Sequence, residues 1–199
     1  MSAQELGALL LFASAMAFTP GPNTTLSAAL AANGGLRAAM RFVLGVPVGW
    51  GLLLLASVLG LGAVLEAAPA LRGVVKTAGL LYMLWLAWKL SRSGTLASAN
   101  GTPLKVGFWQ GVALQGVNIK AWMNALLISA GWITVDAQWV ERTVQVLPLM
   151  MAYGFASNFT YALVGSALRH WLAHGRRLLM FNRVLAAVLV ATAAWLAML

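Results

Sequence analysis

Long apolar stretches alternate with short polar segments along almost the whole chain. Six stretches hold at least 18 mostly apolar residues each, which is enough for a helix to cross the hydrocarbon core of a bilayer. They occupy residues 6–32, 43–65, 71–90, 106–133, 144–167 and 178–198. The segments between them are too short to form a soluble domain. The pattern therefore predicts an all-α polytopic membrane protein with about six transmembrane helices, forming one transport domain over residues 1–199.

Two of these apolar stretches are interrupted near their centres. Thr19-Pro20-Gly21-Pro22-Asn23 interrupts the first, and Asn118-Ile119-Lys120 interrupts the fourth. Each proline removes a backbone donor and clashes with the preceding turn. Irregular backbone at membrane depth is tolerated where it is buried in protein or lines a wet cavity. A proline kink satisfied by neighbouring helices is the alternative, but paired interruptions are typical of a transporter's binding site.

The chain divides into two halves with three apolar stretches each. A polar segment, residues 93–103, separates a first half of about residues 1–92 from a second of about residues 104–199. Three is odd, so two halves with a common fold must lie upside down relative to each other in the membrane. We therefore expect two inverted three-helix repeats, with helices 1 and 4 broken.

Composition agrees with a membrane location. Hydrophobic residues make up 61% of the chain and charged residues only 9%, against about 25% charged in soluble domains. The chain has no cysteine, which excludes disulfides and thiolate metal sites. The first stretch lacks the basic residues that precede the apolar core of a signal peptide, so we expect it to be retained.

The net charge of +9 is best explained as an orientation signal. Three basic residues fall on one side of the predicted membrane: Arg72, Lys76 and Arg142. Nine fall on the other: Arg37, Arg41, Lys89, Arg92, Lys105, Arg169, Arg176, Arg177 and Arg183. The positive-inside rule places these nine in the cytoplasm and both termini outside. No aromatic-studded basic face accompanies them, so nucleic-acid binding is not expected.

Lys120 is the one ionisable residue predicted in mid-membrane. Its side chain is too short to reach either interface, so it must face protein or water, or pair with an anion. The four acidic residues all fall at the ends of apolar stretches or in loops: Glu5, Glu66, Asp136 and Glu141. Two roles therefore remain for Lys120. It binds the carboxylate of a substrate, or it is a structural residue that caps backbone carbonyls at the break.

Further candidate residues lie beside the two interruptions. Asn23 begins the second half of the first stretch, where free N–H groups favour anions, and we expect the freed carbonyls of residues 16–18 to accept from a substrate amino group. Helical spacing also predicts two polar stripes: Gln115, Asn118 and Trp122, and Tyr153, Ser157 and Tyr161 with Asn158 beside them. These stripes either line a cavity or join helices through hydrogen bonds.

No catalytic or metal constellation is apparent. His170 and His174 have helical spacing, but no cysteine or nearby carboxylate completes a site with them. No nucleophile, base and orienting group occur together in the apolar stretches. We expect neither enzyme activity nor a cofactor or metal.

The quoted motifs resemble the lysine exporter and homoserine/threonine resistance (LysE/RhtB) family of amino-acid exporters. The resemblance covers the whole chain, from Thr19-Pro20-Gly21-Pro22-Asn23 through Gly34-Gly35-Leu36-Arg37 and residues 79–89. The family's usual Asn-Pro-Lys-Ala motif reads Asn118-Ile119-Lys120-Ala121 here, without its proline. Basic-amino-acid exporters of the family carry an acidic residue in span 2, whereas residues 45–49 contain none.

The resemblance implies a secondary transporter in the cytoplasmic (inner) membrane that exports neutral amino acids or close derivatives, by proton exchange or along the substrate's own gradient. The expected partners are a small amino-acid-like substrate and membrane lipids, and a homodimer is allowed. The alternatives are a channel or a non-transporting assembly subunit. The substrate-binding residues we predict are Thr19, Pro20, Gly21, Pro22, Asn23, Asn118, Lys120, Trp122, Tyr153 and Asn158.

Overall fold

The computed structural model describes residues 1–61, 64, 67–92, 106–135 and 137–198. Within these residues the chain forms helices and no strand, so the predicted all-α class is confirmed. The predicted linker, residues 93–103, lies outside the described residues.

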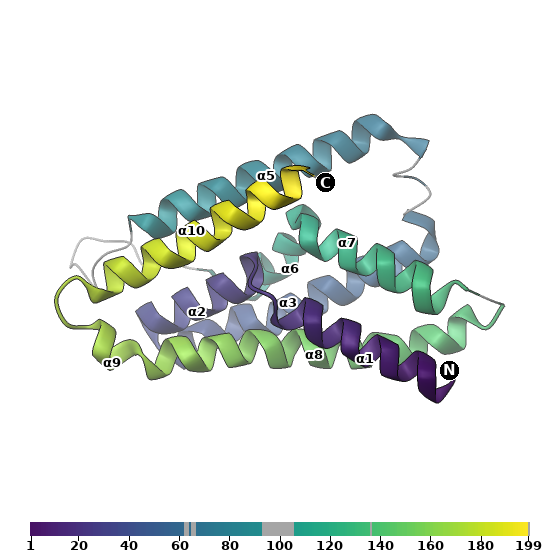
Figure 1. Ribbon diagram of the computed structural model, residues 1–199, viewed down its shortest axis with the longest axis horizontal. Helices are drawn as coiled ribbons and strands as arrows, with labels where there is room; N and C mark the ends of the chain where they lie inside the picture. Colours follow the sequence, from purple (N-terminus) through teal and green to yellow (C-terminus); the bar gives the residue numbers. More distant parts are fainter. Residues whose placement is uncertain (62–63, 65–66, 93–105, 136, 199) are drawn as a thin grey trace.

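The described helices run in long, roughly aligned rods (Figure 1). In chain order they are α1 (Ala3–Phe18), α2 (Pro22–Gly34), α3 (Leu36–Ala56), η1 (Ser57–Leu61), α5 (Pro69–Ser91), α6 (Phe108–Val117), α7 (Ile119–Ile128), η2 (Ser129–Ile133), α8 (Trp139–Ala167), α9 (Arg169–Leu172) and α10 (Arg177–Met198). The segments η1 and η2 are π-helical turns that continue α3 and α7.

The first apolar stretch is interrupted where its sequence predicts. α1 ends at Phe18, and α2 begins at Pro22, its first helical residue. Proline suits this position because its missing N–H would have no partner in the first turn. Gly21 precedes it with an extended backbone, and the first bond within the new helix runs from the Thr25 amide to the Gly21 carbonyl, at 2.9 Å.

The fourth stretch also breaks, although Ile119 replaces the family's proline. α6 ends at Val117 and α7 begins at Ile119, with Asn118 between them at φ −87° and ψ 98°. The Asn118 carbonyl accepts from the amides of Ala121 and Trp122, at 2.9 and 3.1 Å. Asn118 thus starts the new helix through its backbone carbonyl, without a hydrogen bond from its side chain to the first amides of α7, and the break forms without a proline.

Glycines let α3 and α6 pack backbone to backbone. A Cβ atom at Gly45 would lie 2.1 Å from the Phe108 carbonyl oxygen, and one at Gly49 would lie 2.5 Å from that of Val112. Gly111 of α6 makes the corresponding contact with α3, because a Cβ atom at Gly111 would lie 2.7 Å from the Phe42 carbonyl oxygen. The small-residue spacing that the sequence shows is therefore used for close helix contact.

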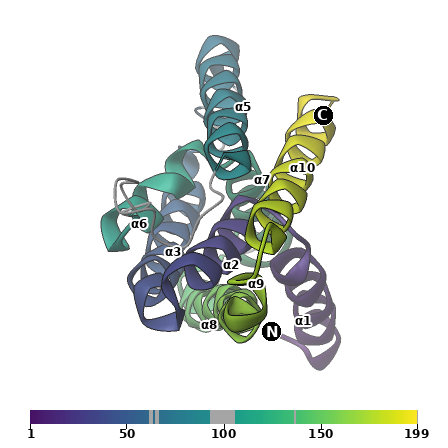
Figure 2. The same cartoon turned by 90° about the vertical axis from the view of Figure 1, so that its left-hand side faces the viewer.

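Similar contacts bring the remaining helices around α2. A Cβ at Gly165 of α8 would lie 2.2 Å from the Ala28 carbonyl oxygen of α2. α5 and α10 lie side by side on one flank of the molecule (Figure 1). Figure 2 shows α2, α3 and α8 gathered on the other side, with α6 beside α3. The start of α2 is thus enclosed by helices from both halves of the chain.

Two of the described helical segments are long and apolar enough to cross a bilayer, Leu36–Gly60 and Arg177–Met198. The apolar helices Ala3–Phe18 and Ile119–Ile133 are shorter. Large apolar side chains point outward along the rods, as at Leu11, which is 75% exposed. Such a surface suits lipid better than water.

Two helices begin well before their apolar stretches, α8 at Trp139 instead of residue 144 and α3 at Leu36. The apolar pattern starts at residue 43, yet α3 begins at Leu36 and so contains Arg37 and Arg41, which we placed in a loop. Helix hydrogen bonds do not depend on side-chain polarity, so the helix continues beyond its apolar part. The boundary is set by Gly35, whose φ of 83° favours glycine.

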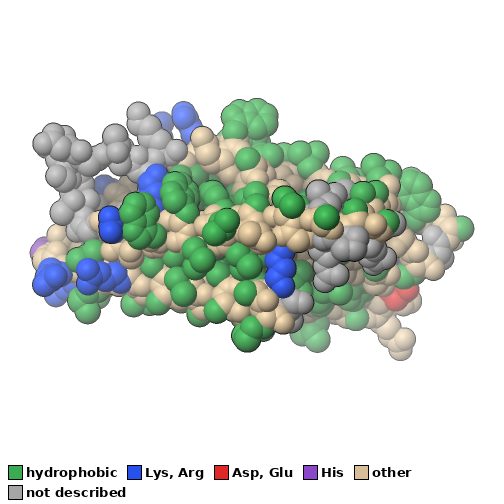
Figure 3. All heavy atoms as spheres, turned by 90° about the horizontal axis from the view of Figure 1, so that it is seen from above, with side chains coloured by type: hydrophobic (Ala, Val, Ile, Leu, Met, Phe, Trp, Pro, Cys, Tyr) green, Lys and Arg blue, Asp and Glu red, His purple; other side chains and the backbone are tan. Residues whose placement is uncertain are grey.

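Basic side chains gather at one end of the molecule (Figure 3). Three of them stack on tryptophan rings near helix ends: Lys89 on Trp85, Arg92 on Trp88 and Arg177 on Trp171. Tryptophan with lysine or arginine is typical of the membrane–water interface.

Candidate functional site

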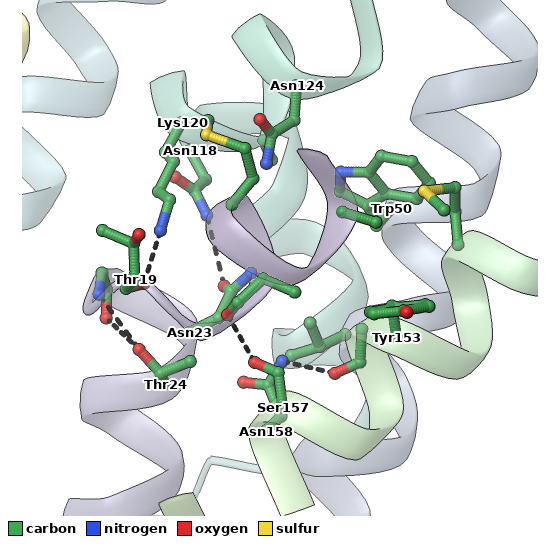
Figure 4. A pocket seen from close by; sticks show the side chains of 18 of the residues that line it. Thr19, Asn23, Thr24, Trp50, Asn118, Lys120, Asn124, Tyr153, Ser157 and Asn158 are labelled. Atoms are coloured by element: carbon green, nitrogen blue, oxygen red, sulfur yellow. Dashed lines mark hydrogen bonds between the residues drawn. The ribbon is translucent and has the colours of Figure 1, made fainter. Parts of the chain in front are cut away.

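A cavity of about 80 Å³ lies where the two interrupted helices meet (Figure 4). Its wall comes from the end of α1, the starts of α2 and α7, and the middle of α3 and α8. The lining residues are Ala13, Met16, Ala17, Thr19, Gly21, Pro22, Asn23, Thr24, Val46, Trp50, Asn118, Lys120, Ala121, Asn124, Ile128, Met150, Tyr153, Gly154, Ser157 and Asn158. A volume of this size suits a small solute.

Eight of the ten predicted binding residues line this cavity: Thr19, Gly21, Pro22, Asn23, Asn118, Lys120, Tyr153 and Asn158. Pro20 is exposed at the break and is not part of the wall. Trp122 is also outside the wall, and its indole N–H donates to the Gly116 carbonyl at 3.0 Å.

The predicted set also misses residues that the structure places in the wall. Trp50 of α3 and Asn124 of α7 are the clearest examples. Asn124 could have been found from helical spacing, because it follows Lys120 by four residues and so lies on the same helix face.

Lys120 joins the two breaks. Its ammonium donates to the Thr19 carbonyl oxygen at 2.5 Å, and its side chain packs against Gly21. The C-terminal end of a helix carries partial negative charge, so a cation is favourable at the end of α1. The structure thus realises the capping role that the sequence allows for Lys120. The same ammonium lies in the cavity wall, where a solute could reach it.

The carbonyls at the end of α1 have protein donors. The Ser157 hydroxyl donates to Ala17 at 2.6 Å, and the Tyr161 hydroxyl donates to Phe18 at 2.9 Å. We expected the carbonyls of residues 16–18 to accept from a substrate amino group; those of Ala17 and Phe18 already have protein donors, and for Met16 this stays a prediction. Ser157 and Tyr161, one turn apart on α8, therefore satisfy two carbonyls that would be costly to leave unpaired away from water.

The two breaks are also joined by amide side chains. Asn23 and Gln115 exchange two hydrogen bonds, at 3.0 and 3.1 Å. Gln115 also donates to the Gly111 carbonyl at 2.9 Å, and Asn118 donates to the Asn23 oxygen at 3.3 Å. This network ties the start of α2 to the break between α6 and α7.

The stripe on α8 both lines the cavity and holds neighbouring helices. Ser27 of α2 donates to the Asn158 oxygen at 3.0 Å, while the Asn158 amide donates to Gly154 at 2.8 Å. The Tyr153 hydroxyl accepts a longer bond of 3.4 Å from Ser14 of α1. The two readings that the sequence left open are therefore both correct for this stripe.

The electrostatics of the cavity favour an anion. α2 and α7 both begin at its wall, and the first amides of a helix have no partner within the helix. Their partial positive charge adds to that of Lys120. The described lining contains no aspartate, glutamate or histidine. The ends of α1 and α6 at the same breaks carry partial negative charge, so the attraction for an anionic group rests mainly on Lys120, the one charged side chain of the described lining.

Nothing in the described residues forms a metal centre. No group of three or more histidine, aspartate or glutamate side chains comes together in the part of the chain that the structure describes. His174 Nδ1 instead lies 3.0 Å from the carbonyl oxygen of His170 on the preceding turn.

An all-helical apolar fold with a small cavity at two helix breaks, lined by Lys120 and several amide side chains, is typical of a membrane translocator of small solutes. The chain belongs to the LysE type translocator family, whose sequence profile matches residues 14–199. It is therefore a membrane transport protein and not an enzyme, and the predicted family is confirmed.

Relatives of known function match along nearly their whole length. The cysteine/O-acetylserine efflux proteins of Salmonella typhimurium (strain LT2) and Escherichia coli (strain K12) are each 32% identical to this chain, over 96% of it and 96% of their own length. That of Klebsiella pneumoniae is also 32% identical, over 96% of this chain and 95% of its own. No solved structure matches the chain at a significant level.

Proposed function

We propose that the protein exports small neutral amino acids or their close derivatives from the cytoplasm. Cysteine and O-acetylserine are the first candidates, because the relatives that align end to end are named as efflux proteins for these two compounds. Both compounds are small zwitterions, which agrees with a cavity of about 80 Å³.

One observation carries the proposal. Lys120 lies in the cavity wall between the starts of two helices, and no acidic side chain of the described lining neutralises it. A substrate carboxylate would take the Lys120 ammonium as its partner and accept from the first amides of α2. The bond from Lys120 to Thr19 would then open or be shared, so that substrate binding would loosen the connection between the two breaks.

The same charges argue for a neutral substrate. A basic amino acid would bring a second ammonium into a wall that already holds Lys120 and offers no carboxylate. Burial of an unpaired charge is strongly unfavourable. We therefore place lysine and arginine outside the substrate range.

We also propose the membrane arrangement expected from the sequence. α1 with α2, and α6 with α7 and η2, each make one broken span, and α3, α5, α8 and α10 make the other four. Two inverted repeats of three spans, rocking against each other, would alternate access to the cavity. The basic, tryptophan-rich end would face the cytoplasm and both termini would lie outside. One chain builds the whole cavity, so this arrangement allows a homodimer and does not require one.

Flux from proteoliposomes tests the proposal. Purified protein, reconstituted with labelled cysteine, O-acetylserine, serine, alanine and lysine in turn, should release the neutral amino acids and retain lysine. Lys120→Met should abolish this release, and empty liposomes give the background. Release that does not saturate with concentration would indicate a channel. No release of any compound would support a non-transporting subunit.

A further inference from the structure

Two amide oxygens near the cavity have no hydrogen-bond donor. They are Oδ1 of Asn118 and Oδ1 of Asn124, both buried, and both residues line the cavity. Asn118 as a whole is only 2% exposed. Buried polar atoms are nearly always paired, so an unpaired acceptor beside a solute cavity points to a donor on the solute.

The orientation of the Asn118 amide follows from a fixed backbone acceptor. The Gly111 carbonyl can only accept, so the group of Gln115 that faces it must be its NH₂. The same NH₂ faces Asn23, which must therefore present its oxygen.

The Asn23 oxygen in turn requires that Asn118 present its NH₂ to it. Rotation of the Asn118 amide would place two oxygens against each other. The relay from Gly111 thus holds the Asn118 oxygen away from the amide network, with no donor.

The two oxygens flank Lys120 along the chain. Asn118 is the residue that precedes α7, and Asn124 follows Lys120 by four residues, one turn along the same helix face. A cation and two neutral acceptors therefore occur within about two turns at the start of one helix. An α-amino acid presents the complementary pair, a carboxylate and an ammonium that share one carbon atom.

We propose that Asn118 and Asn124 accept hydrogen bonds from the substrate ammonium and make a primary amine a requirement for transport. This inference rests on the proposed function. The end of α1 is a weaker candidate for the ammonium, because Ser157 and Tyr161 already donate to its carbonyls. In a zwitterion bound here, Lys120 would compensate the charge of the carboxylate, and the uncharged amide oxygens would accept hydrogen bonds from the ammonium.

The test compares amino acids with the same acids lacking the amine. The pairs are cysteine with 3-mercaptopropionate, O-acetylserine with 3-acetoxypropionate, and alanine with propionate, each labelled and released from proteoliposomes with the membrane potential clamped at zero. Wild-type protein should release the amine of each transported pair about a hundredfold faster, the factor expected for two hydrogen bonds to a charged group at about tenfold each.

Asn124→Leu removes an acceptor with little change in volume. Among the described residues no hydrogen bond of the Asn124 side chain is seen, so the change breaks none there. In this variant the amine preference should fall by about tenfold, because one of the two hydrogen bonds is lost and that to Asn118 remains, while release of the des-amino acid stays unchanged. Asn124→Gln, which keeps a neutral amide acceptor and adds no charge beside Lys120, should retain most of the preference. Asn33→Leu, at a half-buried amide outside the cavity, should leave it unchanged.

The outcomes separate the two proposals. Equal release of both members of a pair by wild-type protein would overturn the ammonium role and leave export intact. So would an Asn124→Leu variant that keeps the full preference, or one that loses both members equally. Failure of wild-type protein to release any compound would refute the proposed function, and the ammonium role with it.

Discussion

The ammonium of Lys120 donates a 2.5 Å hydrogen bond to the carbonyl oxygen of Thr19, so a residue in the first turn of α7 caps the end of α1. The two residues come from opposite halves of the chain and belong to the two interrupted helices. An anion that binds the other two N–H groups of this ammonium would share the positive charge that strengthens the bond. Substrate occupancy and the contact between the breaks are therefore linked through a single side chain.

Lys120→Met should abolish export without preventing membrane insertion. Methionine keeps much of the packing against Gly21 but cannot hold a carboxylate. Lys120→Arg should also fail at least in part, because a planar guanidinium does not replace a compact ammonium. Initial efflux per unit of reconstituted protein is the measurement.

The matched control for this change is Lys76→Met. Lys76 also donates to a backbone carbonyl, that of Ala197 at 3.1 Å, but it is far from the cavity wall. The Lys76→Met variant should transport at the wild-type rate. Equal activity of Lys120→Met and Lys76→Met would exclude the carboxylate-binding role.

Gly45→Ala should destabilise the protein by about 1–3 kcal/mol, the usual effect of overpacking. The added methyl would lie 2.1 Å from the Phe108 carbonyl oxygen, so α3 and α6 would have to move apart. Thermal unfolding in detergent, followed through the tryptophan signal, checks this. Gly116→Ala is the control, because nothing lies within 4 Å of its new methyl, and a midpoint as low as that of Gly45→Ala would contradict the packing argument.

Single cysteines should establish the orientation, since the natural chain has none. Ala137 precedes the long helix α8 and Ala173 follows α9, which continues from the other end of α8 (Figure 1). An impermeant maleimide added to intact cells should label Ala137→Cys and spare Ala173→Cys until the cells are opened. Labelling of both residues from the same side would overturn the proposed topology.

A pH gradient should leave the initial rate of efflux nearly unchanged when the membrane potential is clamped. Proton-coupled carriers use buried carboxylates or histidines, and the described cavity wall has neither. Proteoliposomes with the same internal substrate and opposite pH gradients provide the measurement. A several-fold acceleration by an inward proton gradient would refute this and direct attention to the acids that the sequence places at the ends of apolar stretches, Glu66 first.

Several features of this protein follow from local chemistry and so could be predicted from the sequence. Pro20 and Pro22 cannot continue a helix, and α1 accordingly ends before them. A lysine in an apolar stretch must meet a polar partner, and Lys120 does. The apolar pattern was likewise enough for the helical class, because a backbone in lipid must satisfy its own hydrogen bonds.

The partners of these groups were decided by the tertiary structure. Asn23 and Gln115 lie 92 positions apart, and Tyr161 reaches the Phe18 carbonyl across 143 positions. Such contacts depend on how helices cross, which in turn depends on glycines such as Gly45 and Gly165 meeting a neighbouring backbone. Periodicity along one helix cannot determine these crossings. The sequence alone thus located the two breaks and Lys120, whereas only the packing of α2, α6 and α7 left Asn118 and Asn124 with free oxygens beside the cavity.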